Sequence, residues 1–513
     1  MMFGELLHIL PQASAHGQPP AGQVTGLAYD SRRVEPGMIF AALKGEAADG
    51  HSYVAQAARA GAAAALVERP VQGADLWQVR VPDSRAALAK LAAEFFGNPS
   101  RSMTLVGITG TNGKTTTMYL TESILARRGQ AGLIGTVEAR FAGQVIPAAM
   151  TTPESVELQS LLADMRSAGV KQAVMEVSSH ALEQRRADWV EFDAAVFTNL
   201  SRDHLDYHGN METYLTAKLR LFRDLLPASL EAGKSAAAIV CLDGEYGPAV
   251  AQAVQEAGLP LWTYGFNPEA KVRGQNPRLG LDGGSCRVVW PGGDFRAHTP
   301  LVGHYNLQNL LAAATVGLSL GMQPAEIAAG LEVCQGVPGR LQRVGGPQAR
   351  PAVFVDYAHT DDALTQVLAA LKPLTRGRLI CVFGAGGDRD PGKRSLMGLA
   401  VGRGADAALL TSDNPRTEEP SAIMAMIEPG LKEAGMSHAE TLQGGGIYLT
   451  RPDRAQAIAL AIASAQDDDV VLIAGKGHED YQIVGREKRH FDDREQAQAA
   501  LAARSKGGAH ASL

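Results

Sequence analysis

The sequence has few cysteines and no long apolar run, and these absences exclude several classes of protein. Four cysteines occur in 513 residues, at spacings that fit neither a disulfide framework nor a zinc site: Cys241, Cys286, Cys334 and Cys381. No apolar segment is long enough to span a bilayer, and the opening stretch MMFGELLHILPQ lacks a basic leader and a cleavage site. We therefore expect a cytoplasmic protein with free thiols and no membrane insertion.

Strong charge of one sign is also lacking. The net charge is −6 and no long lysine or arginine run occurs, so a nucleic-acid partner has no electrostatic support. Apolar residues make up 45% of the chain and charged residues 20%, a globular balance that argues against disorder. A chain of 513 residues is too long for one core, and its length predicts about three domains.

What the sequence does contain is a regular alternation of apolar runs and amphipathic segments. Runs such as LVGITG, AVMEVSS, AAVFTNL and AAAIVCLDG are each flanked by helical patterns, and a further set (AVFVDYAH, LICVFGA, AALLTSD, VVLIAGKG) follows the break at CQGVPGR. This rhythm predicts an α/β fold with mostly parallel sheets and ligands at the carboxyl ends of strands. We place three domains at residues 1–100, 101–338 and 339–513.

A phosphate-binding loop is the most specific local signal. The stretch VGITGTNGKTTT, residues 106–117, reads as a buried strand, a loop and a helix start, although Ile108 stands where the full phosphate-loop pattern needs glycine. Gly110 and Gly113 allow successive N–H groups to converge on one anion, and the helix that follows adds its N-terminal donors. Lys114 is then placed to reach terminal phosphates and the Thr115 hydroxyl to bind Mg²⁺.

Three further features in the middle of the chain can each be interpreted either as ordinary structure or as part of a functional site. Glu176, at the end of an apolar run, is in a position typical of a Mg²⁺ ligand, although glutamates at strand ends are common. The loop FTNLSRDHLDYHG is a solvated polar loop or a cluster of ligands: Asp203, His204, Asp206 and His208. On the helix METYLTAKLRLF, Lys218 lies beside an apolar stripe, and a lysine in such a place is ordinarily a surface residue.

Three charged loops follow strands in the last third of the chain: GGDRDPGKR, SDNPRTEEP and AGKGHEDYQ. Each carries charge of both signs. Together they suit a zwitterion, because arginine binds a carboxylate through paired N–H groups and carboxylates bind an ammonium. The alternative is that these charges only solvate the loops.

Taken in order, these motifs resemble the Mur ligase family. The resemblance runs from about residue 24 to about residue 495 and rests on TGTNGKT, MEVSSH, TNLSRDHLDYHG, GHYNLQNLLAA, PGRLQ, VDYAHT, FGAGGDRD, DNPRTEEP and GKGHEDYQIVG. It implies three α/β domains: one for the UDP-substrate, a central P-loop ATPase and a C-terminal Rossmann-like domain for the amino acid. The implied activity is ATP-dependent amide formation, releasing ADP, in peptidoglycan precursor synthesis.

Within the family, the resemblance is to members that add meso-diaminopimelate to UDP-N-acetylmuramoyl-L-alanyl-D-glutamate through an acyl phosphate. It implies ATP as co-substrate, Mg²⁺ as cofactor, and catalytic roles for Lys114, Glu176, His204 and Lys218. The implied metal ligands are Thr115, Glu176, His204 and Lys218, the last as a carbamate (N6-carboxylysine). The implied ATP contacts are Thr109, Gly110, Thr111, Asn112, Gly113, Lys114, Thr115, Asn309, Arg340 and Asp356.

The resemblance also implies two further substrate sites. The UDP-substrate site has two parts. The uridine-nucleotide part comprises Tyr29, Ser31, Glu46, Ala47 and Ala48, and the muramoyl-peptide part comprises Thr151, Thr152, Ser178, Gln184 and Arg186. The diaminopimelate site comprises Arg389, Asp413, Asn414, Pro415, Arg416, Gly475 and Glu479. Two residues depart from the family pattern: Met150 replaces a frequent asparagine, and Asp361 replaces proline, which we expect to change only the rigidity of a turn.

Three rival interpretations remain: a lysine-adding sister ligase, a folylpolyglutamate synthase, and a P-loop module that only senses nucleotide. The DNPR stretch argues against the first two, because a lysine substrate has no distal carboxylate for Arg416. The third domain, with its three charged loops, argues against the sensor, because a sensor does not need such a domain. We expect a monomer.

Overall fold

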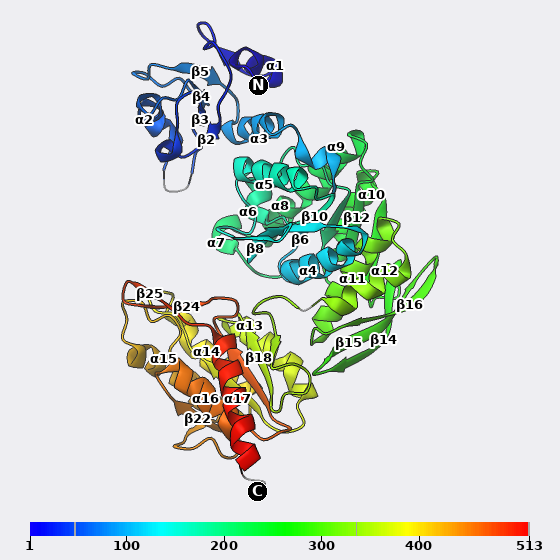
Figure 1. Cartoon of the computed structure of the whole chain (residues 1–513), viewed down its shortest axis with the longest axis vertical. Coiled ribbons are helices and arrows are strands. Elements are labelled where there is room, and N and C mark those ends of the chain that lie inside the picture. Colours follow the sequence, from blue (N-terminus) through cyan, green and yellow to red (C-terminus); the bar gives the residue numbers. More distant parts are fainter. Residues whose placement is uncertain (46–47, 335, 511–513) are drawn as a thin grey trace. The chain divides into compact units, whose positions relative to one another are not determined.

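The computed structural model describes residues 1–45, 48–334 and 336–510, which divide into two compact units (Figure 1). Unit 1 comprises Met1–Gly274, Val288–Phe295 and Asn309–Leu331. Unit 2 comprises Gln275–Arg287, Arg296–Gln308 and the chain from Glu332 onward. None of the helices described is both long and apolar enough to cross a membrane.

The first part of unit 1 is a small sheet with short helices around it. The strand order is β1-β5-β4-β3-β2, and all the pairs except β1–β5 are parallel. The strands are β1 (Ser14–Ala15), β2 (Leu27–Ala28), β3 (Ile39–Ala41), β4 (Ala64–Val67) and β5 (Trp77–Arg80), and the helices are α1 (Leu6–Ile9), α2 (Val54–Arg59) and α3 (Ser84–Phe95). Asp83 begins α3 because its side chain accepts the N–H groups of Arg85 and Ala86, donors that lack a partner within the helix.

An 11-stranded sheet follows, in the order β16-β15-β14-β13-β12-β11-β6-β10-β7-β8-β9. Its strands are β6 (Thr104–Thr109), β7 (Ala131–Ile134), β8 (Glu138–Phe141), β9 (Gln144–Pro147), β10 (Gln172–Glu176), β11 (Ala194–Phe197), β12 (Ala237–Cys241), β13 (Leu261–Gly265), β14 (Val272–Gly280), β15 (Gly283–Trp290) and β16 (Gly293–Thr299). The central strand β6 is parallel to both of its neighbours, with Ile108 opposite Glu176 and Thr109 opposite Phe197. The loops that follow β6, β10 and β11 therefore leave the same edge of the sheet.

Helices pack against this sheet because their apolar faces need cover. They are α4 (Lys114–Leu125), α5 (Ser155–Ser167), α6 (Ser179–Glu183), α7 (Leu205–His208), α8 (Met211–Arg220), α9 (Leu226–Glu231), α10 (Gly247–Glu256), α11 (His304–Ser319) and α12 (Pro324–Val333). A π-helical turn, Leu221–Leu225, joins α8 to α9, and its Leu221 and Phe222 are buried in the core that also contains Met175 and Phe197. Such turns are rare in proteins, and those that occur are often found at functional sites.

Unit 2 contains a seven-stranded sheet in the order β17-β18-β23-β19-β20-β22-β21, parallel except for β17. Its strands are β17 (Gln342–Val344), β18 (Ala352–Asp356), β19 (Leu379–Phe383), β20 (Ala407–Leu410), β21 (Ser437–His438), β22 (Ile447–Thr450) and β23 (Val470–Ala474). One face packs against α13 (Asp361–Leu371), α14 (Gly392–Gly404) and α15 (Pro420–Glu433), and the other against α16 (Arg454–Ser464) and α17 (Asp493–His510).

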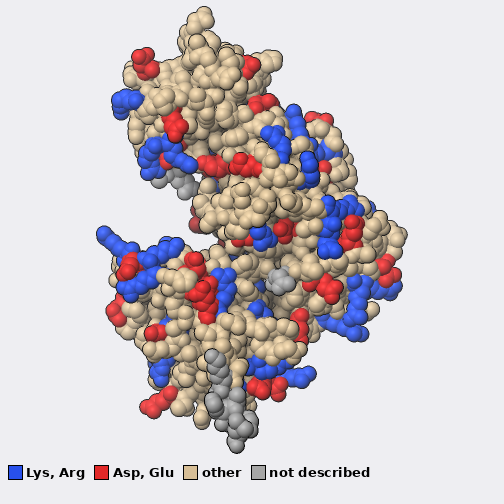
Figure 2. All heavy atoms as spheres, in the orientation of Figure 1, with Lys and Arg blue, Asp and Glu red and all other residues tan. Residues whose placement is uncertain are grey.

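A hairpin of two strands, β24 (Tyr481–Val484) and β25 (Glu487–His490), follows β23. The exposed residues Arg486, Lys488 and Arg489 belong to it, and Figure 2 shows basic side chains gathered over this hairpin. Elsewhere on the same face, acidic and basic side chains are interspersed.

The predicted α/β class and the mostly parallel sheets are confirmed. All eight apolar runs quoted above from the middle and last parts of the chain contain a strand, from β6 to β23. Continuous apolar runs are typical of parallel strands covered on both faces, which is why this part of the fold is readable from sequence. The three domain ranges stay a prediction.

Candidate active site

The phosphate-loop candidate joins β6 to α4, and glycine is required at both of its glycine positions. Gly110 has φ +146° and Gly113 has φ +83°, values that side chains disfavour. A Cβ at Gly110 would overlap the Thr198 hydroxyl, and one at Gly113 would overlap Asn309 Oδ1. Gly113 is the residue immediately before α4, so the N–H groups of the first helical turn lie next to this loop.

The loop after β11 supports the phosphate loop from one side. Thr198 Oγ1 donates to Asn112 O at 2.6 Å, and the Asn112 N–H donates to Asn199 Oδ1 at 2.9 Å. Lys114 lies over its own loop, with Nζ donating to Gly110 O at 3.0 Å and to Thr111 O at 2.9 Å. The loop is therefore held in shape by protein contacts alone.

Glu176, at the end of β10, is fully buried beside the start of α4. Its carboxylate accepts the Thr115 hydroxyl at 3.0 and 3.1 Å and the N–H and hydroxyl of Thr136 at 2.8 and 3.1 Å. A threonine hydroxyl paired with a carboxylate supplies the oxygen donors that Mg²⁺ prefers, so these two residues fit the predicted metal. Thr136 was missed by sequence reasoning, because its stretch LIGTVEA carries no functional motif.

Lys218 is not a surface residue. It lies on α8 with only 2% of its surface exposed, and its Nζ donates to Gly110 O at 2.9 Å and lies 4.4 Å from the centre of the Tyr214 ring. Burial lowers the pKa of Lys218 well below its usual value, and the nearby charge of Lys114 lowers it further. The surface interpretation is therefore wrong, and the amine lies against the phosphate loop.

The polar loop after β11 divides into solvated and buried members. Asp203 and Asp206 are exposed, as a solvated loop predicts, whereas His208 is buried and its Nε2 lies 2.9 Å from Ser179 Oγ. Burial lowers the pKa of His208 to about 4. The partly exposed His204 ring contacts the ring of Tyr214, the residue that lies over Lys218. Within the described residues, no group of three or more His, Cys, Asp or Glu side chains could hold a metal ion.

The residues predicted for the muramoyl-peptide contact each other around the strand end of Glu176. Thr152 Oγ1 donates to Glu176 O at 2.9 Å and accepts the Ser178 N–H at 3.1 Å. The hydroxyl oxygens of Thr136 and Thr151 lie 3.1 Å apart, within hydrogen-bond distance. Arg186 donates to Thr152 O at 3.2 Å and to Gln184, while its Nε pairs with Glu154 at 2.9 Å. The departing residue Met150 takes part too, since its sulfur accepts from Arg186 at 3.3 Å.

The predicted uridine-site residues lie in the first part of unit 1. Tyr29 donates its hydroxyl to Glu157 on α5 at 2.9 Å, and Ser31 is buried in a short 3₁₀ turn. Glu46 and Ala47 lie outside the described residues, next to the exposed Ala48.

The three later nucleotide residues lie in two different units. Asn309, in unit 1, accepts the Thr117 hydroxyl at 3.3 Å and lies beside Gly113, so it joins the phosphate loop. Asp356, in unit 2, accepts the N–H groups of Leu341 at 2.6 Å and Ala358 at 2.8 Å, and burial raises its pKa. The guanidinium of Arg340 lies 5.2 Å from the centre of the Tyr357 ring. The departing residue Asp361 is the first residue of α13, where a negative charge is favoured.

The three charged loops of unit 2 meet at the carboxyl ends of β19, β20 and β23. Arg416 has φ +51° and donates through Nη1 to Gly387 O at 2.7 Å. Asn414 donates through Nδ2 to Glu479 Oε2 at 3.0 Å, and a Cβ at Gly475 would crowd Asp413. Gly386 lies between the side chains of Arg389 and Arg416. The three loops therefore contact one another, and their role as a site for a zwitterion stays a prediction.

Sequence reasoning missed three buried cations in unit 2: Arg394, Arg454 and Lys476. Arg454 pairs with Asp493 at 2.7 Å, both fully buried, and donates to Ala474 O at 2.9 Å, which ties α16 and α17 to the end of β23. Lys476 is fully buried beneath Asn414. A lysine in a polar loop gives no sequence signal that distinguishes it from a solvated one.

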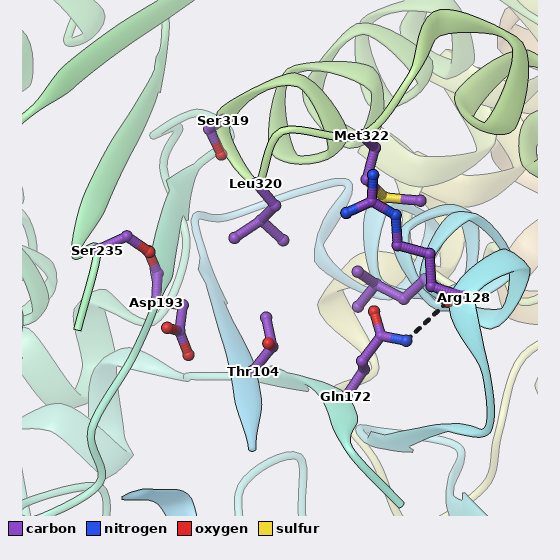
Figure 3. Close-up of a pocket in the computed structure, with 9 residues that line it drawn as sticks. Thr104, Arg128, Gln172, Asp193, Ser235, Ser319, Leu320 and Met322 are labelled. Carbon is purple, nitrogen blue, oxygen red and sulfur yellow. Dashed lines mark hydrogen bonds between the residues drawn. The ribbon is translucent and has the colours of Figure 1, made fainter. Parts of the chain in front are cut away.

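A cavity of about 300 Å³ lies at the opposite end of the unit 1 strands, near the amino end of β6 (Figure 3). Gln172 donates to Leu125 O at 3.1 Å within it, as the dashed line shows. The charges at its wall are already paired, Arg128 with Glu326 at 3.0 Å and Asp193 with Lys234 at 3.0 Å. Because ligands of parallel sheets bind at the carboxyl ends, this cavity is not the candidate active site.

Comparisons with known proteins agree with this arrangement. Residues 23–96 match the profile "Mur ligase family, catalytic domain", residues 108–317 "Mur ligase middle domain" and residues 339–477 "Mur ligase, glutamate ligase domain". Two relatives named UDP-N-acetylmuramoyl-L-alanyl-D-glutamate–2,6-diaminopimelate ligase come from Geobacter species. The Geobacter metallireducens protein is 45% identical over 98% of both chains, and the Geobacter sulfurreducens protein is 46% identical over 94% of this chain and 96% of its own.

Solved structures give the same result. A structure of a protein with the same ligase name superposes with a TM-score of 0.73 at 32% identity, covering 98% of this chain and 99% of its own. Folylpolyglutamate synthase from Mycobacterium tuberculosis has a TM-score of 0.58 at 18% identity, covering 83% of this chain and 95% of its own, and shares the fold alone. With three matching profiles and relatives of this identity along its length, the chain belongs to the Mur ligase family.

Proposed function

We propose that this protein is the ATP-dependent ligase that adds meso-diaminopimelate to UDP-N-acetylmuramoyl-L-alanyl-D-glutamate. The observation that carries the proposal is the pairing of two distinct sites in one chain. Unit 1 has a phosphate loop flanked by the Thr115–Glu176 pair and a buried lysine. Unit 2 has two loops that meet, one with Asn414 and Arg416 and the other with Glu479, the groups that a distal zwitterion needs.

In the proposed reaction, the γ-phosphate of ATP passes to the side-chain carboxylate of D-glutamate and ADP leaves. The amine of diaminopimelate then attacks the carbonyl carbon of the acyl phosphate, and the C–O bond to phosphate breaks. The loop N–H groups and Lys114 bind the phosphates and stabilise the charge on the transferred group. Thr152, Ser178 and Arg186 lie next to Glu176 and would orient the muramoyl-peptide carboxylate.

Mg²⁺ is the metal whose preferences fit the residues beside the phosphate loop. Thr115 and Glu176 would hold it, His204 would serve a second metal position, and a carbamate on Lys218 would supply a further anionic oxygen ligand. Bound there, it would neutralise phosphate charge. A buried lysine with a lowered pKa has a larger share of neutral amine, the form that reacts with carbon dioxide, and the carbamate supplies an anionic oxygen in place of a cation.

The test of the proposed function is a substrate comparison. The protein is incubated with ATP, Mg²⁺, UDP-N-acetylmuramoyl-dipeptide and either diaminopimelate, lysine or a folate with glutamate, and phosphate release and product mass are measured. We expect product with diaminopimelate only. Comparable rates with lysine would point to the lysine-adding ligase, and nucleotide binding without any product would point to a sensor.

Gly110→Ala is expected to raise the KM for ATP about 5- to 150-fold. The new Cβ would overlap the Thr198 hydroxyl at a φ of +146°, and a strained backbone position costs about 1–3 kcal/mol. Steady-state kinetics with varied ATP gives the KM. Gly129→Ala is the matched control, because Gly129 has φ +137° with open space around it. Equal ATP KM values in the Gly110→Ala protein and the wild type would contradict the assignment of this loop.

Arg416→Ala is expected to lower kcat/KM for diaminopimelate by at least about 10- to 150-fold and to leave the KM for ATP unchanged. A charge-assisted hydrogen bond contributes about 1.5–3 kcal/mol, which converts to that ratio. The disadvantage of lysine relative to diaminopimelate should shrink in the variant, because the missing distal carboxylate no longer matters. Arg403→Ala, an exposed arginine on α14, is the control. An Arg416→Ala enzyme with wild-type kcat/KM for diaminopimelate would rule out this role.

A further inference from the structure

Lys476 follows β23 and is a lysine with no exposed surface in the midst of polar loops. Its ammonium has three N–H groups, and three acceptors surround Nζ: Tyr481 O at 2.8 Å, Asn414 Oδ1 at 3.0 Å and Asp413 Oδ1 at 3.4 Å. An ammonium with all its donors matched in this way is a fixed part of the structure. Because it is fully buried, it is not itself a contact for a ligand.

The contacts of Lys476 decide how the Asn414 side chain is oriented. Asn414 Oδ1 accepts from Lys476 and also from the Ile483 N–H at 2.9 Å, so the amide oxygen faces two donors. The Nδ2 group must then point the other way, where it donates to Glu479 Oε2 at 3.0 Å. An amide turned by half a rotation would put N–H groups against both donors, which is unfavourable.

The same lysine joins two loops that are far apart in sequence. Its bond to Tyr481 O fixes the start of β24, and Gln482 donates to Asp413 O at 2.6 Å beside it. The Arg416 N–H donates to Ile483 O at 3.1 Å, so the DNPR backbone pairs with the same strand. Asp413 is buried and serves as the internal counter-charge of Lys476.

We propose that Lys476 is a positioning residue for the amino-acid substrate. It orients Asn414 so that Asn414 presents an N–H donor, and Glu479 a carboxylate acceptor, to the distal zwitterion. This inference rests on the proposed function. Lys476 thereby couples the β23–β24 loop to the DNPR loop without touching the substrate.

A double-mutant cycle tests the inference. Lys476→Met, Asn414→Ala and the double variant are compared with the wild type in the full-length enzyme, by the KM for diaminopimelate, the KM for ATP and kcat. We expect Lys476→Met to raise the KM for diaminopimelate at least about 10-fold with the KM for ATP unchanged, since about one charge-assisted bond is lost. In the Asn414→Ala background the same change should alter that KM less than about 3-fold, because residues that act through one another are not additive.

Lys234→Met is the matched control, because Lys234 is a largely covered lysine paired with an aspartate, at the amino end of the unit 1 strands. It should leave the KM for diaminopimelate unchanged. If Lys476→Met does not fold, Lys476→Gln, which keeps two N–H donors, is measured in the same cycle. Equal effects in both backgrounds, or an unchanged KM in a folded variant, would overturn the inference alone. A wild-type enzyme that does not ligate diaminopimelate would overturn the proposed function and this inference with it.

Discussion

Lys218→Ala is expected to lower turnover at least about 100- to 1000-fold, the usual cost of losing a group that stabilises transition-state charge. Lys218 is buried against the phosphate loop, 2.9 Å from Gly110 O, where a carbamate would place an anionic oxygen beside the phosphates. A buried lysine with a packing role alone would instead lose about 0.5–3 kcal/mol of stability and leave the folded enzyme active. Phosphate release under saturating substrates separates the two forecasts.

The control for this variant is Lys171→Ala, which removes an exposed lysine of the same unit and should leave turnover unchanged. Added formate or acetate should partly restore the Lys218→Ala enzyme, because a small carboxylate can take the place of the missing carbamate. Mass measurement of the native wild-type protein in bicarbonate should show carbon dioxide bound at Lys218. A fully active Lys218→Ala enzyme, or a wild-type enzyme whose Lys218 stays a bare amine with Mg²⁺ bound, would refute the carbamate.

Lys114→Ala is expected to lower turnover at least about 100-fold, with little change in the melting temperature. Lys114 is partly exposed, and its Nζ donates to the loop carbonyls Gly110 O and Thr111 O, so its removal takes away contacts of the loop. When ATP binds, its ammonium is placed to stabilise charge on the transferred phosphoryl group. The measurements are kcat for phosphate release and thermal unfolding of both proteins.

The matched control is Lys234→Ala, because Lys234 also donates to a main-chain carbonyl, Met103 O, but lies at the amino end of the strands. That variant should lose some stability and keep its turnover. Near-normal ligation by a Lys114→Ala enzyme with unchanged unfolding would mean that the loop does not bind the reacting phosphates.

Much of the fold was determined by the sequence itself. Strands covered on both faces are continuous apolar runs, so β6, β10, β11, β12, β18, β19, β20 and β23 were all readable. The sequence also predicted that Gly110 and Gly113 take backbone angles that other residues disfavour. In the structure both have positive φ, and a Cβ would overlap Thr198 at Gly110 and Asn309 at Gly113. Placing Glu176 and the DNPR loop at strand ends followed from the parallel topology.

Which charged side chains are buried was decided only by the tertiary structure. Lys218 lies beside an apolar stripe, and helical periodicity cannot distinguish a lysine that reaches solvent from one covered by a distant loop such as Gly110–Gly113. Lys476 and His208 belong to polar segments whose residues are usually solvated, yet both are buried. Burial of a charge depends on acceptors contributed by residues far away in sequence, such as Asn414 and Asp413 for Lys476, and no local pattern records them.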